Sequence, residues 1–185
     1  RFRMLRRHFI AALAAAAGLG LAAPAFAADA GEPVIVTVTG NVANPNRGKL
    51  DEFEDAVFAH LQVTFDKGRT FTLADLKAMP QRTVTAKYPE WPREVTATGP
   101  ALTDVLKAAG AEGKKILVQA ADGYAPEFTG DDVKRDKMIL AIEMDGKPLA
   151  MGGRGPAWLF GPPDSFANQQ ADEGFVFEVI RIDVQ

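Results

Sequence analysis

Glycine and proline divide the second half of the chain into short apolar runs. Helices usually need about ten residues or more, so short runs between turn residues are typical of β-strands. The pair Asp145-Gly146 between two runs further predicts a tight β-hairpin. The second half is therefore expected to be rich in sheet. The runs cover residues 116–120, 138–144, 147–151 and 157–160, and they end at Asp122-Gly123, Asp145-Gly146, Gly152-Gly153-Arg154-Gly155-Pro156 and Gly161-Pro162-Pro163.

A few short helices are expected among these strands. Apolar residues recur at helical spacing over 50–61. Thr72 and Asp75 have the spacing of a capping box and predict a helix over 73–79. A further helix is expected to start at Gly99-Pro100, since proline is favoured in a first helical turn. Strands over 34–39 and 175–184, the last with a bulge near Arg181, complete an α+β fold of mixed sheets.

The first 27 residues read as a cleaved export signal. Arg6 and Arg7 precede an apolar run too short for a stable membrane anchor, and Ala25-Phe26-Ala27 forms a small-x-small cleavage site. The arginine pair fits either an ordinary secretory signal or a twin-arginine signal. We therefore expect a periplasmic protein with a single domain over residues 28–185 and no membrane anchor after cleavage.

Composition excludes several partners and cofactors. Removing residues 1–27 takes away four arginines and no acids, leaving 17 basic and 24 acidic side chains and a net charge of −7. Nucleic acids and anionic lipids need a basic surface, so they are not expected as partners. The chain has no cysteine, which excludes a zinc site built from His and Cys, and iron–sulfur clusters. No metal ligand is predicted.

Common catalytic motifs are also absent. The chain after residue 27 holds one histidine, His60, and one serine, Ser165, in segments that do not suit a catalytic triad. The run Gly152-Gly153-Arg154-Gly155 has two interpretations. It is either a bend between strands or an anion site with backbone donors and one guanidinium. Arg154 is the best candidate for contact with a ligand.

The order of motifs along residues 34–184 resembles the molybdopterin-binding domain of the sulfite oxidase family. Each motif is weak alone, but their order is specific. The resemblance implies the fold of that domain and a possible molybdopterin cofactor. The matching motifs are Thr37–Val42, Phe71–Leu76 with Met79-Pro80-Gln81, Leu102–Leu106 with Ala109-Gly110, Asp122-Gly123-Tyr124, Leu140-Ala141, Asp145–Leu149 and Gly155-Pro156.

Two departures from the family affect its chemistry. The family has a molybdenum-binding cysteine after the strand that follows the first helix, whereas this chain has no cysteine in residues 85–91. A metal there would rely on the pterin's own sulfurs, with an oxygen ligand such as Glu90. The family also has an arginine near the pterin phosphate, where this chain has Trp158. The closer resemblance is to short, cysteine-free exported members.

Two functions remain open at this point. The chain is either an active molybdopterin-dependent oxidoreductase or a non-catalytic, cofactor-degenerate module that binds a small ligand or a periplasmic protein. We interpret the sequence as the second, leaving catalysis undecided. If the chain binds a cofactor, the predicted site residues are Gly153, Arg154, Gly155, Asp122, Tyr124, Trp91 and Trp158. If it is a binding module, the predicted cleft is formed by the aromatic side chains of Tyr88, Trp91, Tyr124, Trp158 and Phe160.

Overall fold

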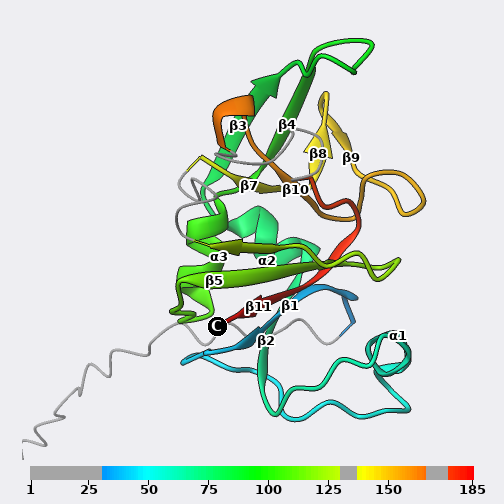
Figure 1. The fold of residues 1–185 in the computed structure, drawn as a ribbon, viewed down its shortest axis with the longest axis vertical. Helices are drawn as coiled ribbons and strands as arrows, with labels where there is room; N and C mark the ends of the chain where they lie inside the picture. Colours follow the sequence, from blue (N-terminus) through cyan, green and yellow to red (C-terminus); the bar gives the residue numbers. More distant parts are fainter. Residues whose placement is uncertain (1–30, 130–136, 166–174) are drawn as a thin grey trace, which may run out of the picture.

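Three β-sheets follow one another along the long axis of the molecule (Figure 1). The computed structural model describes residues 31–129, 137–165 and 175–185. The five-stranded sheet has the order β2-β1-β11-β5-β6, in which only β1 and β11 are parallel neighbours. Its strands are β1 (Val34–Gly40), β2 (Gly68–Thr72), β5 (Lys115–Ala120), β6 (Glu127–Thr129) and β11 (Val179–Val184).

The other two sheets form the end of the molecule that carries the candidate site. One has the order β3-β4-β8-β9, and the other pairs β7 with β10. Strand β4 connects them, because the amide of Ile142 just after β7 donates to Thr98 in β4. The strands are β3 (Gln81–Ala86), β4 (Val95–Pro100), β7 (Ile139–Ala141), β8 (Glu143–Met144), β9 (Lys147–Pro148) and β10 (Trp158–Phe160). The predicted α+β fold is confirmed.

The helices of the described residues are short. They are α1 (Ala56–His60), α2 (Leu73–Ala78), α3 (Leu102–Ala108) and the 3-10 turn η1 (Pro163–Ser165). The predicted capping box is present at α2, where Thr72 and Asp75 exchange side-chain and backbone hydrogen bonds. The predicted start of α3 at Gly99-Pro100 is wrong. Both residues belong to β4, paired with Arg82 and Gln81, and the helix begins only at Leu102. None of the described helices has the length and apolarity needed to cross a membrane.

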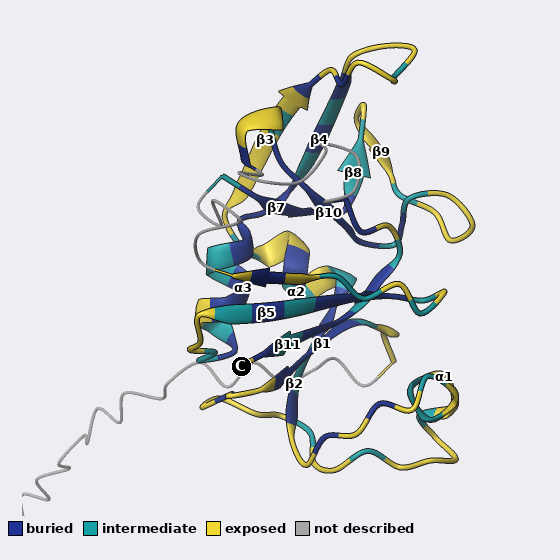
Figure 2. Cartoon of the chain, viewed as in Figure 1, coloured by how far each residue is buried: buried dark blue, intermediate teal, exposed yellow. Residues whose placement is uncertain are grey.

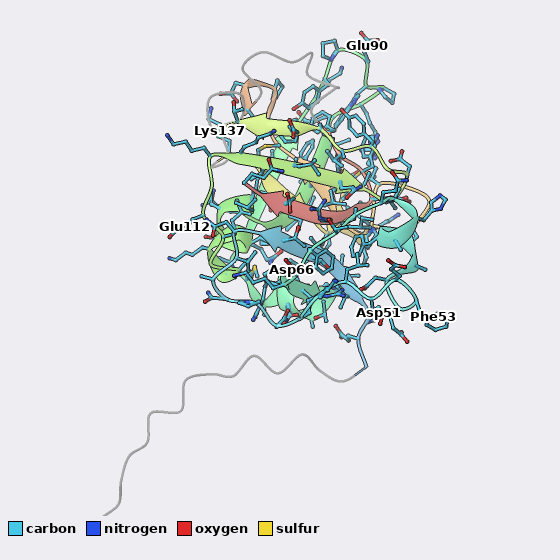
Figure 3. All side chains as sticks on the ribbon, turned by 60° about the horizontal axis from the view of Figure 1, so that its bottom comes forward. Asp51, Phe53, Asp66, Glu90, Glu112 and Lys137 are labelled. Atoms are coloured by element: carbon cyan, nitrogen blue, oxygen red, sulfur yellow. The ribbon has the colours of Figure 1, made fainter. Side chains whose placement is uncertain are left out.

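The helix expected over 50–61 is also shorter than predicted. Only five residues form α1, and none of them is buried. Phe53 is 87% exposed and projects from the edge of the molecule beside Asp51 (Figure 3). The carboxylate of Asp51 accepts the amides of Phe53 and Glu54, and such local bonds compete with helix formation.

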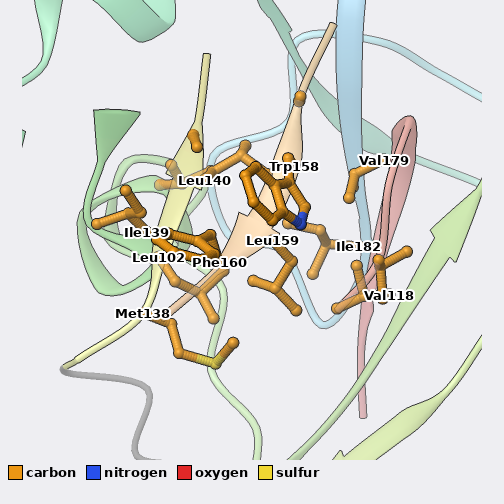
Figure 4. Close-up of a cluster of buried hydrophobic side chains, with 14 of the residues drawn as sticks. Leu102, Val118, Met138, Ile139, Leu140, Trp158, Leu159, Phe160, Val179 and Ile182 are labelled. Atoms are coloured by element: carbon orange, nitrogen blue, oxygen red, sulfur yellow. The ribbon is translucent and has the colours of Figure 1, made fainter. Parts of the chain in front are cut away.

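The core runs through all three sheets. Buried residues concentrate where β7 and β10 lie between the two larger sheets (Figure 2). Figure 4 shows Trp158, Leu159 and Phe160 of β10 among buried side chains such as Leu140 and Ile182. All five side chains are fully buried. The strand that carries the aromatic residues of the candidate site is thus fixed by the core itself.

Two sequence signals for local backbone geometry are confirmed. Asp145 and Gly146 both have positive φ, 51° and 74°, in the two-residue turn between β8 and β9. Such φ values are typical of the hairpin turns that Asp-Gly favours. The register of β11 against β5 shifts between Val179 and Arg181, where the bulge was expected.

The predicted export signal lies outside the described residues.

Candidate functional site

An aromatic cluster forms the base of the candidate site. Tyr88 and Trp91 come from the loop after β3, and Trp158 and Phe160 come from β10. The Trp158 and Phe160 rings lie 4.4 Å apart, and Trp91 stacks on Phe160 at 6.0 Å. Phe175 closes the cluster at 4.7 Å from Tyr88. Tyr88, Trp158, Phe160 and Phe175 are buried, while Trp91 is partly buried.

Arg154 covers this cluster with its guanidinium group. The group lies 4.5 Å from the ring centre of Phe177, 4.8 Å from Trp158 and 5.4 Å from Trp91. It makes no hydrogen bond or ion pair with any other residue that the structure describes. Burial lowers the pKa of Arg154, and the nearby charge of Arg93 lowers it further. The rings therefore hold a cation whose hydrogen-bond donors are available to a ligand.

The glycine loop that carries Arg154 uses its own amides internally. The amides of Gly153 and Gly155 both donate to Ala150, and that of Gly152 donates to the carboxylate of Glu178 at 2.6 Å. A Cβ on Gly155 would lie 2.4 Å from the Leu149 side chain, so the loop packs too closely there for any other residue. The Arg154 side chain, rather than the amides of Gly152, Gly153 and Gly155, is the part of this loop that can contact a ligand.

A basic groove opens beside Arg154. Its volume is about 570 Å³, and its charged lining comprises Arg93, Asp145, Lys147 and Arg154. Asp145 pairs with Arg93 at 2.6 Å, and this bond together with the amide of Thr96 lowers the pKa of Asp145. The groove therefore has three cations and one carboxylate, which is already paired with Arg93. Its net charge is positive, whereas the chain as a whole is acidic.

The predicted residues Asp122 and Tyr124 lie next to this site without lining the groove. Both belong to the turn between β5 and β6, where Asp122 accepts the amide of Tyr124. The turn reaches the Arg154 loop through Glu178, whose backbone oxygen accepts from Ala121 and whose amide donates to Arg154. Tyr124 is 47% exposed. The structure thus brings Trp91, Arg154 and Trp158 together and leaves Asp122 and Tyr124 one turn away.

Sequence reasoning missed three residues of the site. Arg93 and Lys147 supply two of the three cations of the groove, and Glu178 ties the glycine loop to its neighbours. Arg93 follows Trp91 by two positions, and its charge beside a predicted pocket residue was an available signal. Glu178 adopts a positive φ of 48°, which nothing in its sequence context indicated.

Molybdenum does not fit this set of residues. The chain has no cysteine and therefore offers no thiolate, the protein ligand that the resemblance implies for the metal. In the segment after β3, Tyr88 is buried and donates its hydroxyl to Gly161 at 2.6 Å. The Arg154 guanidinium lies 4.8 Å from the ring centre of Trp158, the residue at the position where the resemblance predicts an arginine.

Part of the chain matches a known protein family. Residues 92–163 match the family model described as the oxidoreductase molybdopterin binding domain. The predicted resemblance to the sulfite oxidase-type molybdopterin-binding domain is therefore confirmed, and with it a possible link to molybdopterin.

A solved structure of this type is also similar to the chain. It is the sulfane dehydrogenase SoxCD from Paracoccus pantotrophus, with 20% sequence identity and a TM-score of 0.56. The match covers 80% of this chain but only 37% of the SoxCD chain. At this identity the likeness shows the fold alone. No curated protein matches the sequence.

Proposed function

We propose that the chain is a cofactor-degenerate binding module that keeps the fold of a molybdopterin-binding domain without its molybdenum chemistry. The observation that carries the proposal is the Arg154 guanidinium. It is half-buried, held over three aromatic rings and free of hydrogen-bond partners among the described residues. Arginine groups held in this way bind carboxylates and phosphates through two parallel hydrogen bonds. The ligand is accordingly a small anion.

The basic groove supports the same ligand class. Arg93 and Lys147 add positive charge beside Arg154, and the cavity has the size of ordinary small-molecule sites. A small anion therefore fits both the charge and the size of this groove.

The module is proposed to act in the periplasm. The support comes from the sequence before residue 28, with its arginine pair, apolar run and small-x-small cleavage site. The alternative function, an active periplasmic molybdopterin-dependent oxidoreductase, is favoured by the family match to residues 92–163. It lacks support from metal ligands among the described residues.

The test is a calorimetric titration with inorganic phosphate at low salt. We expect saturable 1:1 binding to the wild-type protein and a loss of at least tenfold in affinity for Arg154→Gln, which removes the charge but keeps an amide donor. Lys107→Gln removes an exposed charge on α3 away from the groove and serves as the matched control. Equal affinity in wild type and Arg154→Gln, or no binding to either, would overturn the proposal.

A further inference from the structure

A second cavity lies on the helix-covered face of the five-stranded sheet. It has a volume of about 450 Å³ and shares no lining residue with the basic groove. Arg69 and Phe71 of the edge strand β2 reach it from the same face as their partners Val38 and Val36, which belong to the core. We call this cavity the Arg69 pocket. Its other lining residues include Asn44, Asp75, Met79 and Ala108.

Arg69 contributes an unpaired cation to this pocket. Its guanidinium lies 5.6 Å from the ring centre of Phe71 and makes no hydrogen bond or ion pair with any described residue. Its Nε is shielded from water and has no partner in the described part of the chain. Buried donors of this kind are nearly always satisfied in proteins, so Nε is a position where a water or a ligand oxygen can accept a hydrogen bond.

Asp75 and Asn44 contribute free acceptors to the same pocket. Asp75 accepts the amide and the hydroxyl of Thr72 on Oδ2, which leaves Oδ1 without a partner among the described residues. Asn44 donates through Nδ2 to Ala108 at 3.4 Å, and its amide oxygen is likewise unpaired there. Asp75 and Arg69 form no ion pair with each other, although both line the pocket.

From this arrangement we infer that the Arg69 pocket binds a small apolar α-amino acid. The carboxylate pairs with the guanidinium of Arg69, and the ammonium donates to the oxygens of Asp75 and Asn44. The side chain of the ligand covers Met79 and Ala108, which together with Phe71 make the pocket mainly apolar. A ligand with one negative charge alone would meet Asp75 unfavourably, whereas a zwitterion matches both charges of the pocket.

The first arm of the test varies the ligand. L-leucine is titrated into the wild-type protein by calorimetry beside 4-methylpentanoate, which lacks the ammonium group, and 3-methylbutylamine, which lacks the carboxylate. We expect saturable 1:1 binding of leucine and at least tenfold weaker binding of both analogues. Failure of leucine to bind, or equal affinity for either analogue, would overturn the inference.

The second arm varies the protein. Arg69→Gln removes the cation, and Ala78→Phe fills the pocket from an exposed position on α2. Both are expected to weaken leucine binding at least tenfold, while Lys77→Gln, an exposed change on the same helix outside the lining, leaves it unchanged. Melting curves identify any variant that fails to fold. If Arg69→Gln fails to fold, Ala78→Phe still tests the inference. A folded Arg69→Gln or Ala78→Phe protein that binds leucine with wild-type affinity would overturn the inference.

Discussion

At the scale of single residues, Tyr88 connects the site to the core. Its ring packs against Trp91 and Phe175, and its hydroxyl donates to the carbonyl of Gly161. Burial raises the pKa of Tyr88 well above its usual value, and the negative charge of Asp164 adds to this effect. Tyr88, two residues after the end of β3, therefore has a structural role.

Replacing Tyr88 by phenylalanine removes one hydroxyl and tests this role. The carbonyl of Gly161 loses its donor, so we expect the free energy of unfolding to fall by about 1–3 kcal/mol. Denaturant unfolding measures the change. The same replacement at Tyr124, which is 47% exposed, should cost less. An unchanged stability in Tyr88→Phe would show that the buried hydrogen bond does not contribute.

The raised pKa of Tyr88 also sets the sign of a pH dependence. The folded state holds the phenolic proton more tightly than the unfolded state, whose tyrosine titrates near pH 10. This contribution to stability is complete below about pH 10 and is lost as the pH rises further. The Tyr88→Phe protein should lose less stability above pH 10 than the wild type does.

At the scale of elements, a buried polar network joins β1, β5 and β11. Arg181 pairs with Asp183 at 2.7 Å and donates to Thr39 and Gln119. Burial alone would raise the pKa of Asp183, but hydrogen bonds from Thr39 and Gln185 and the charge of Arg181 outweigh it and lower the pKa. The network fixes the register of the only parallel pair among the described strands.

Asp183→Asn leaves the buried Arg181 without its counter-ion. Because an unpaired buried charge is costly, we expect a loss of about 3 kcal/mol in the free energy of unfolding at pH 7. Since the folded-state pKa of Asp183 is lowered, the wild type keeps this stabilisation above about pH 4 and loses it as the pH falls. The variant should show a shallower acid slope. Asp66→Asn, at an exposed carboxylate, is the control, and a similar loss there would contradict the account.

Local signals in the sequence predicted the elements whose geometry is set locally. The capping box of α2 and the Asp-Gly turn between β8 and β9 need only neighbouring residues, and both are present. The extent of α1 and the start of α3 were wrong because tertiary contacts decide them. Residues at helical spacing over 50–61 find no core to cover, and Gly99-Pro100 pair with β3 instead of starting a helix.

In the candidate site, too, some residues could be predicted from the sequence and others depend on tertiary contacts. Trp91, Arg154 and Trp158 were selected from chemical character and family motifs, and they meet in space. Arg93 and Lys147 were not selected, because only the pairing of β4 with β8 and of β8 with β9 brings them beside Arg154. For Lys147, long-range register of this kind has no local sequence signal, whereas the position of Arg93 two residues after Trp91 was one.

At the scale of the whole molecule, the fold is similar to that of a molybdopterin-binding domain, while the chain has no cysteine that could supply a thiolate to molybdenum. The sheets, the short helices and the order of motifs agree with that family, and residues 92–163 match its model. The places expected to hold the metal and the phosphate carry a buried aromatic cluster and a single unpaired arginine. Function resides in such sites more than in folds, which is why the two can diverge.

The most direct test is the molybdenum and pterin content of the protein purified from the periplasm of a molybdenum-replete host. It compares the intact chain with Arg6→Lys/Arg7→Lys, which disables a twin-arginine signal. We expect that neither protein carries molybdenum or fluorescent pterin above background. Stoichiometric molybdenum and pterin in the intact protein would contradict the proposed binding module and favour the alternative function, an active oxidoreductase.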